Sequence, residues 1–319
     1  MRQMPAKVGL KTSKICYVPS AVSSFFEICD RNPDGTKIRD PLQIGARGGG
    51  FKLQKGNITQ AVSENTITRN EVEINGKLSP VARTSLRVIE LVREKYDFPP
   101  VKILHKISPP IGSGFGTSGA GALGTAIALG DLFNLHFTLS EAAGFAHIAE
   151  IQSVTGLGTV LSLASGGGAI GLVTEPGSYS VGRTDAILSD YDKFVLVCAS
   201  FGPIEKSTIL SKESARRKVN EFGRKTLENI LKDPTPESLL RYSREFSEKA
   251  GLASRNLLKL SDKAVELGAI GATPNMIGNA IHCLVLKTRY ENFSKGFSKL
   301  VPKKFIFESE LVHDRMSFV

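Results

Sequence analysis

Hydrophobic and polar residues follow a two-residue period in several parts of the first third of the chain. This period predicts β-strands, because successive side chains of a strand point to opposite faces. Residues 14–28 are interpreted as two short strands joined around Pro19-Ser20, and residues 57–75 as a small meander ending at an Asn75-Gly76 turn. Residues 101–107 form a further predicted strand.

A helical period governs other stretches. An apolar stripe with Pro80 at its start predicts a helix over residues 80–96, and helices are also expected over 118–133 and over 140–154, with Ser140 as the N-cap. Residues 211–267 are predicted as about three helices, broken at Asp233-Pro234 and Gly251. Later strands are expected at 169–173, 179–182, 194–200 and 303–308, and residues 269–286 as a glycine-punctuated loop followed by an apolar segment. This order predicts an α+β protein of two lobes, with a ligand between them.

The segment between the strand at 101–107 and the helix at 118–133 is rich in glycine: it runs PPIGSGFGTSGAGA over residues 109–122. Its glycines, Gly112, Gly114, Gly116 and Gly119, adopt backbone conformations that other residues avoid and let amides approach a ligand closely. Thr117 and Ser118 add hydroxyls where the helix begins. Amide N–H groups at a helix N-terminus favour phosphate, so this loop is predicted to be a polyanion cradle.

Other interpretations of the loop are weaker. A merely flexible glycine loop does not explain its place between an apolar strand and a helix of small residues. Gly114, Gly116 and Gly119 fit G-x-G-x-x-G, but a dinucleotide fold needs a second strand ending in an acidic residue, and here a second helix follows. A Walker A loop is excluded because no lysine follows the last glycines.

The loop resembles the phosphate loop P-x-x-x-G-L-G-S-S-A-A of the GHMP kinases, which include galactokinase, homoserine kinase and mevalonate kinase. Further stretches, VPSAVSSFFEI, GARGGGFKL, AHIAEIQSVTGLG and GATPNMIGNAI, resemble the archaeal pantoate kinases within that family and extend over most of residues 15–285. The resemblance implies a GHMP-kinase-like fold with domains at 1–165 and 166–319. It implies ATP-dependent phosphorylation of pantoate to 4-phosphopantoate for coenzyme A biosynthesis.

Residue roles follow from the same resemblance. The phosphates of ATP are expected at Gly112, Ser113, Gly114, Gly116, Thr117 and Ser118. Ser118 and Glu150 match the positions that hold Mg²⁺ in the family, and Ser23 lies in the first motif, which lines the substrate site. His147 and Glu150 also lie three residues apart on one helix face; a metal pair is one interpretation and an ordinary helix pair the simpler one.

Arg47 precedes three glycines, and the planar fork of arginine suits a carboxylate, so it is our candidate for holding an anionic substrate. An exposed arginine beside a β-bulge is the alternative, which the sequence alone favours slightly.

Related sequences place an aspartate, the expected catalytic carboxylate, where this chain has Thr159. Glu27 or Asp40 are other candidates for the base. The family's third motif is also less rich in glycine here, as ATPNMIG.

Composition adds limits. A net charge of +10 raises nucleic acid as a partner, but the basic residues are dispersed and no nucleic-acid-binding signature accompanies them; residues 216–225 are interpreted as a solvated helix face. No long apolar run indicates a membrane span, and the first residues lack the apolar region of a signal peptide.

Four scattered cysteines indicate buried thiols of a cytoplasmic protein. Base rates favour a homodimer. A kinase of homoserine or mevalonate, or an inactive nucleotide-binding regulator, remains the alternative function.

Overall fold

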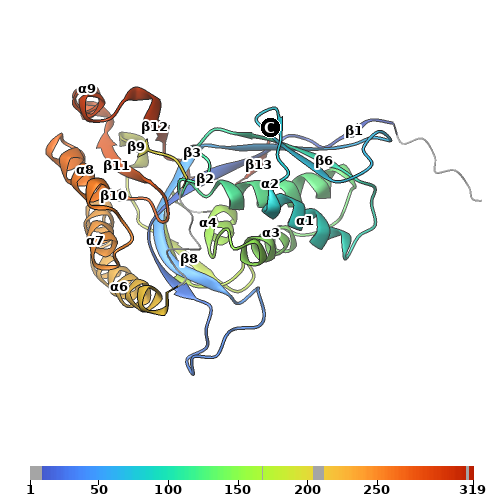
Figure 1. The fold of residues 1–319 in the computed structure, drawn as a ribbon, viewed down its shortest axis with the longest axis horizontal. Coiled ribbons are helices and arrows are strands. Elements are labelled where there is room, and N and C mark those ends of the chain that lie inside the picture. The colour runs from blue at the N-terminus through green and yellow to red at the C-terminus, as the bar shows by residue number, and fades with distance from the viewer. Residues whose placement is uncertain (1–8, 167, 204–211, 314–315) are drawn as a thin grey trace, which may run out of the picture.

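Two β-sheets with helices packed against them make up the computed structural model, which describes residues 9–166, 168–203, 212–313 and 316–319 (Figure 1). The strands are β1 Lys11–Thr12, β2 Cys16–Cys29, β3 Gly45–Ser63, β4 Glu71–Ile74, β5 Lys77–Leu78, β6 Lys102–Ile107, β7 Ile170–Glu175, β8 Arg183–Ala186, β9 Phe194–Ser200, β10 Gly271–Pro274, β11 Ala280–Leu286, β12 Ile306–Glu310 and β13 Ser317–Phe318. The α-helices are α1 Arg83–Arg93, α2 Thr117–Leu132, α3 Leu139–Ser153, α4 Thr159–Ala164, α6 Glu213–Lys232, α7 Pro236–Lys249, α8 Arg255–Glu266 and α9 Tyr290–Leu300.

The larger sheet is organised around β3. Its strands follow the order β13-β2-β3-β6-β4-β5, with β1 and β7 also paired to β3 and β8 paired to β7. β2 lies along one edge of β3, while β7 and β6 share its other edge, β7 at residues 48–51 and β6 at residues 57–62. A long strand can serve both partners because each takes a different part of its length. Strand β7, which begins at Ile170, is hydrogen-bonded into this sheet, so the sheet extends beyond residue 165. A domain boundary was expected at that residue, and the boundary stays a prediction.

Helix α2 packs against the larger sheet, α1 contacts it at β4, and α3 packs against α1 and α2 (Figure 1). α2 runs across β3 at close range, which its small residues permit: a Cβ at Gly124 would lie 2.5 Å from Thr59 Oγ1. The core between these layers contains Val88, Ile103 and Leu123, all with no exposed surface. This close packing fixes the N-terminus of α2, and with it the end of the glycine loop.

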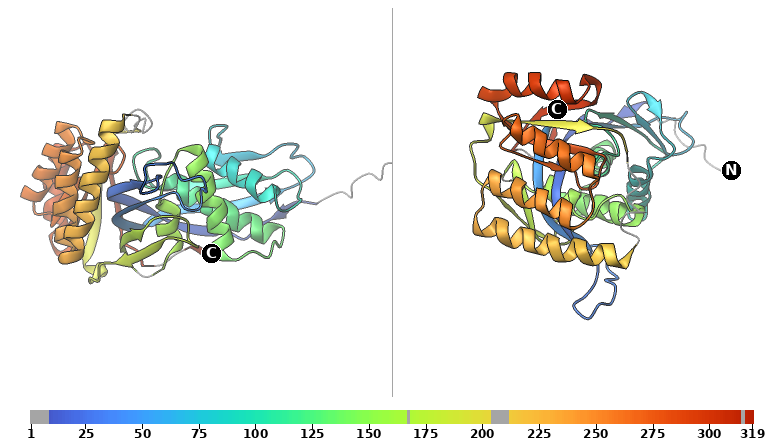
Figure 2. Two further views of the ribbon diagram at one scale, coloured as in Figure 1. Left: turned by 90° about the horizontal axis from the view of Figure 1, so that it is seen from below. Right: turned by 60° about the vertical axis from the view of Figure 1, so that its left-hand side comes forward.

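The smaller sheet has the order β10-β11-β9-β12 and is antiparallel throughout. Helices α6, α7, α8 and α9 belong to the same lobe and form its outer layer in Figure 2. The two sheets are joined where β12 meets β3: Leu311 bridges Leu53, and the Lys55 N–H donates to Ser309 Oγ at 3.0 Å. None of the helices in the described part of the chain combines the length and the apolarity that a bilayer crossing requires.

The expected α+β class with two lobes is confirmed. The strand predicted at 194–200 has those bounds, and the helices expected at 80–96, 118–133 and 140–154 are present with shifted ends. The region predicted as three helices contains α6, α7 and α8, although residue 211, its predicted start, lies outside the described residues. Three of the cysteines are buried as expected, whereas Cys29 is partly exposed.

Other predictions of local structure are wrong. Residues 16–29 form one strand, because Pro19 lies in a register shift rather than a turn. The antiparallel meander expected over residues 57–75 does not form, because β3 continues through Ser63 and Glu71–Ile74 pairs in parallel with β6. Its expected Asn75-Gly76 turn is confirmed, and it joins β4 to β5. Thr138, not Ser140, caps α3, through a reciprocal pair of hydrogen bonds with Glu141.

The remaining errors concern short elements. Residues 179–182 form turns, and β8 follows them. The strand expected at 303–308 begins only at Ile306, and the loop expected after residue 269 contains β10. Helices α4 and α9 were not predicted. α4 has only six residues, too few to show a helical period, and the apolar stripe of α9 was overlooked.

Candidate active site

The glycine loop between β6 and α2 contains three glycines in the left-handed region, Gly112, Gly114 and Gly116, with φ of 78°, 83° and 64°. A side chain at any of these positions would strain the backbone. Gly116 is the N-cap of α2, so the loop ends directly on the N-terminus of the helix. The unpaired amides of that first turn carry the positive end of the helix dipole.

Alternate residues of the loop face opposite sides. Gly114, Gly116 and Ser118 line a cavity, whereas Ser113 and Phe115 are buried and do not. The carbonyl oxygens of these two buried residues are held from behind: Asn275 Nδ2 donates to Ser113 at 3.0 Å, and the Ala21 N–H donates to Phe115 at 3.3 Å. In a planar trans peptide the C=O and the next N–H point in opposite directions. The amides of Gly114 and Gly116 are therefore directed away from these two donors.

Ser118 and Glu150 are brought together at the start of α2. Ser118 Oγ donates to Glu150 Oε1 at 2.9 Å, and Glu150, on α3, is only 2% exposed. Two glycines leave room for this carboxylate: a Cβ at Gly119 would lie 3.0 Å from Glu150 Oε2, and one at Gly156 would lie 2.6 Å from Oε1. The site thus presents a hydroxyl and a carboxylate, both hard oxygen ligands, beside the cradle.

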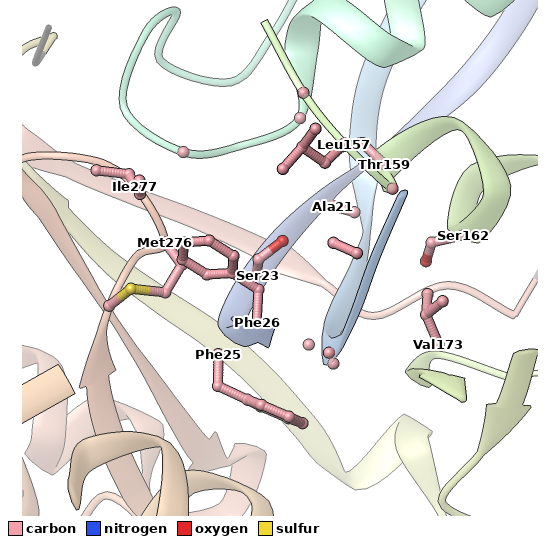
Figure 3. Close-up of a pocket in the computed structure, with 18 of the residues that line it drawn as sticks. Ala21, Ser23, Phe25, Phe26, Leu157, Thr159, Ser162, Val173, Met276 and Ile277 are labelled. Atoms are coloured by element: carbon pink, nitrogen blue, oxygen red, sulfur yellow. The ribbon is translucent and has the colours of Figure 1, made fainter. Parts of the chain in front are cut away.

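The cavity has a volume of about 460 Å³ and lies between the two lobes (Figure 3). Ser23 and Phe26 from β2 and Met276 from the β10–β11 loop lie on one side of it, and Thr159 and Ser162 from α4 on another. Most of the other residues that line the cavity are apolar or glycine. Such a cavity suits a small ligand with an apolar middle and a few polar ends.

Arg47 lines the cavity but is also bound to Glu27. Arg47 Nη2 donates to Glu27 Oε1 at 3.0 Å, and Arg47 Nε lies 2.9 Å from Oε2 in an ion contact without hydrogen-bond geometry. Arg224, from α6, reaches the same carboxylate with Nη2 at 3.0 Å. Two guanidinium groups against one carboxylate leave one positive charge in this cluster. Burial lowers the pKa of Arg47, but Glu27 and Cys29 together outweigh this and the pKa is raised overall.

A second ion pair lies on the cavity wall. Arg216 Nη2, also from α6, donates to Asp30 Oδ2 at 2.6 Å, and both residues line the cavity. The interpretation of residues 216–225 as a solvated face is therefore wrong for Arg216, which lines the cavity; Arg224 is exposed as expected, although it also pairs with Glu27. Their partners lie 186 and 197 positions away in the chain, so sequence periodicity gave no signal for either contact.

The residues considered as catalytic bases are placed as follows. Thr159 is the first residue of α4 and lines the cavity, with a hydroxyl in place of a carboxylate. Glu27 is 3% exposed, bound to its two arginines and not part of the lining. Asp40 is exposed, and its Oδ1 accepts the Leu42 N–H at 2.9 Å in a turn. Among the described lining residues, Asp30 carries the only carboxylate.

Other predicted residues lie outside the cavity lining. Gly112, Ser113 and Thr117, which were also expected at the phosphates, are not part of this lining, and their role at the phosphates stays a prediction; Ser113 Oγ donates to Gly202 O at 3.1 Å. His147 does not face a metal site: its Nε2 lies 2.9 Å from the Ile44 carbonyl oxygen, and burial lowers its pKa.

Comparison with known proteins places the chain in context. The family model described as "GHMP kinases N terminal domain" matches residues 83–167. A pantoate kinase of Thermococcus kodakarensis is 32% identical over 278 residues, 84% of this chain and 86% of the relative. A pantoate kinase of Methanocaldococcus jannaschii is 28% identical, covering 86% and 94% of the two chains. A solved structure named "Phosphotransferase related to CoA biosynthesis pathway" superposes with a TM-score of 0.82 at 27% identity, over 97% of this chain and 98% of the other.

Proposed function

Because this chain belongs to the GHMP kinase family, we propose that it transfers the γ-phosphoryl group of ATP to the primary hydroxyl of pantoate and forms 4-phosphopantoate for coenzyme A biosynthesis. One observation carries the proposal: a single cavity joins a phosphate cradle to a guanidinium cluster with a surplus positive charge. The cradle suits the triphosphate, and the cluster suits an acidic acceptor. The pantoate kinases among the relatives supply the identity of the acceptor.

The phosphates of ATP bind to the amides of Gly114 and Gly116 and to the first turn of α2. These groups are backbone donors fixed before the ligand arrives, so binding costs little reorganisation. Ser118, at the same helix terminus, adds its hydroxyl. We expect Gly112, Ser113 and Thr117 to act indirectly, by shaping the loop, because their side chains and Cα atoms lie outside the lining.

Ser118 and Glu150 would hold Mg²⁺. The described residues contain no group of three or more His, Cys, Asp or Glu side chains that could enclose a metal on their own. Mg²⁺ does not need one, since it is commonly held by one or two carboxylates together with substrate phosphates and water. The 2.9 Å contact of Ser118 with a buried carboxylate fits such a site. When bound, the metal would neutralise charge on the phosphates.

Pantoate fits the other end of the cavity by its chemistry. Its carboxylate complements the positive charge that Arg47 and Arg224 leave over after pairing with Glu27. Its two methyl groups match the apolar walls, to which Phe26, Val173 and Met276 contribute (Figure 3). Ser23 offers a hydroxyl on β2, in the strand next to Arg47.

The reaction then proceeds without a directly placed protein carboxylate as base. The acceptor oxygen bonds to the γ-phosphorus, the bond from that phosphorus to the bridging oxygen breaks, and ADP leaves. The hydroxyl proton passes to solvent or to a phosphate oxygen, since Thr159 is not basic and Asp30 is paired with Arg216. Phosphoryl transfer has a loose transition state, so positioning and charge stabilisation supply most of the acceleration. A positioned base typically adds about a hundred- to ten-thousandfold, so turnover without one is slower but real.

Three alternatives differ in what they require. Homoserine carries an ammonium group, and the one carboxylate of the described lining, Asp30, is already neutralised by Arg216. An inactive regulator would agree with Thr159 but leaves the Ser118–Glu150 pair without a purpose. Mevalonate shares a carboxylate and a methyl group with pantoate, so only an assay separates these two acceptors.

The proposal is tested by ADP release from Mg-ATP with pantoate, homoserine and mevalonate as separate acceptors, using the native chain and Ser118→Ala. We expect turnover with pantoate alone and its loss in the variant. Preference for another acceptor would overturn the substrate assignment, and ATP binding without turnover on any acceptor would favour the inactive regulator. A homodimer, a cytoplasmic location and the absence of a nucleic-acid partner stay predictions.

A further inference from the structure

A row of buried hydrogen bonds leads from β2 through β11 to the back of the glycine loop. Ser24 Oγ lies 2.8 Å from His282 Nε2, and His282 Nδ1 lies 2.9 Å from Asn275 Oδ1. Asn275 Nδ2 then donates to the Ser113 carbonyl oxygen at 3.0 Å. Ser24 and His282 have no exposed surface, and Asn275 is 2% exposed. The row therefore joins residues of both lobes in a region without water access.

The Ser113 carbonyl at the end of the row determines which group donates in each of its hydrogen bonds. The Ser113 carbonyl can only accept, so Asn275 must present its NH₂ group there and keep Oδ1 as an acceptor. His282 must then carry its proton on Nδ1, which leaves Nε2 to accept from the Ser24 hydroxyl. Burial lowers the pKa of His282 to about 3, so its ring is neutral, with one proton, at neutral pH.

The same contact determines where the next amide points. Holding the Ser113 carbonyl makes the Gly114 N–H point in the opposite direction within the same peptide plane. Gly114 is in the left-handed region and lines the cavity. Packing reinforces this orientation, because a Cβ at Gly278 would lie 2.2 Å from the Ser113 oxygen and one at Gly114 would lie 3.0 Å from the Asn275 Cβ. The peptide has little room to rotate.

We propose that Asn275, oriented by His282 and Ser24, is a positioning residue that holds the Gly114 N–H toward a phosphate oxygen of ATP. The proposal rests on the proposed kinase function, since it assigns ATP to this cradle. Asn275 acts through the loop and does not itself touch the nucleotide. It belongs to the second lobe, whereas the loop belongs to the first, so the phosphate site depends on both.

Two variants and a matched control test it. Asn275→Ala removes the tether, and Asn275→Asp keeps the shape but replaces the donor by a group that cannot donate to a carbonyl. Thr273→Val is the control: Thr273 is fully buried two residues earlier, and its hydroxyl pairs with Ser247 Oγ at 3.2 Å, away from the glycine loop. The dissociation constant of Mg-ATP is measured by calorimetry without an acceptor, alongside the urea midpoint of each protein.

Both Asn275 variants should weaken Mg-ATP binding by about 10- to 150-fold, the range for one hydrogen bond to a charged group. The KM for pantoate should change far less. Thr273→Val should lose stability without loss of affinity. Because His282 stays neutral in Asn275→Ala, the ratio of the affinity of this variant to that of the wild type should not change between pH 6 and 9.

Wild-type affinity in a folded Asn275→Asp or Asn275→Ala protein would overturn the inference and leave the kinase assignment intact. Equal loss of affinity in Thr273→Val and Asn275→Ala would overturn it as well, because Asn275 would then act only through general stability. A wild-type protein that binds no Mg-ATP would remove the kinase function itself, and with it the role of Asn275.

Discussion

Replacing Arg47 by alanine should raise the KM for pantoate while leaving kcat nearly unchanged. Arg47 lines the cavity, and its side chain keeps 33% of its surface exposed although it is bound to Glu27. If it binds the acceptor carboxylate, the variant loses a hydrogen bond between charged groups, worth about 1.5–3 kcal/mol. This corresponds to a roughly 10- to 150-fold increase in KM. The carboxylate is remote from the reacting hydroxyl, so the bond is equally present in the transition state and kcat is spared.

Arg224→Ala is the matched control. Arg224 binds the same Glu27 carboxylate but is not part of the cavity lining, and its side chain is 60% exposed. Both variants leave the buried Glu27 with a single partner, so both should lose stability. Arg224→Ala also removes the surplus charge of the cluster, but at an exposed site this should raise the KM for pantoate only a few-fold.

The assay is steady-state kinetics with pantoate varied at saturating Mg-ATP, at two salt concentrations. The KM of the wild type should rise with salt, because the guanidinium cluster is partly open to solvent. An Arg47→Ala protein with the wild-type KM, or one whose KM rises no more than that of Arg224→Ala, would refute the assignment of the carboxylate to Arg47.

Three further predictions concern the metal site, the buried histidines and the missing base. Gly156→Ala places a Cβ 2.6 Å from Glu150 Oε1, so the carboxylate must shift and the apparent affinity for Mg²⁺ should fall about 10- to 100-fold in a metal titration; unchanged affinity would contradict a role of Glu150 at the metal. Burial lowers the pKa of His105 to about 4 and that of His282 to about 3, so below about pH 6.5 the unfolded state binds protons that the folded state does not. The free energy of unfolding should therefore decrease as the pH falls, by about 3 kcal/mol between pH 6.5 and 5 for the two rings together. In urea unfolding, a His105→Gln variant should lose about half of this pH dependence, and an unchanged dependence would contradict the role of His105. Thr159→Asp introduces a carboxylate into the cavity, so the pH profile of kcat should gain a limb near pH 4–5 that the wild type lacks; a wild type that already shows this limb would reveal a base that we have not placed.

The sequence was sufficient for the parts of the site that are local. Gly112, Gly114 and Gly116 alternate with other residues ahead of Thr117 and Ser118, and this pattern indicates both a left-handed loop and a helix N-terminus. The Ser118–Glu150 contact could be expected because both residues match positions of a family motif. Strand β9 was predicted with its observed bounds, because a short apolar run rich in valine fits a strand that is buried on both faces.

The rest depends on contacts between distant residues. Pro19 suggested a break, yet the long strand β2 continues through it because the register shift beside Pro19 takes up its missing N–H. The role of α6 could not be read from its basic residues, since Arg216 and Arg224 meet partners at the other end of the chain. Asn275 was part of a motif that was considered only for its lack of glycine. Its importance becomes visible only when Ser113 lies against it.

The central claim is that pantoate is the acceptor and its primary hydroxyl the site of phosphorylation. The most direct measurement is ¹H–³¹P correlation NMR of the product formed from pantoate and Mg-ATP by the purified protein. We predict a phosphorus signal coupled to the C4 methylene protons, formed in equal amount to ADP and absent when pantoate is omitted. ADP formation without a coupled product, or coupling to the C2 proton instead, would contradict the claim.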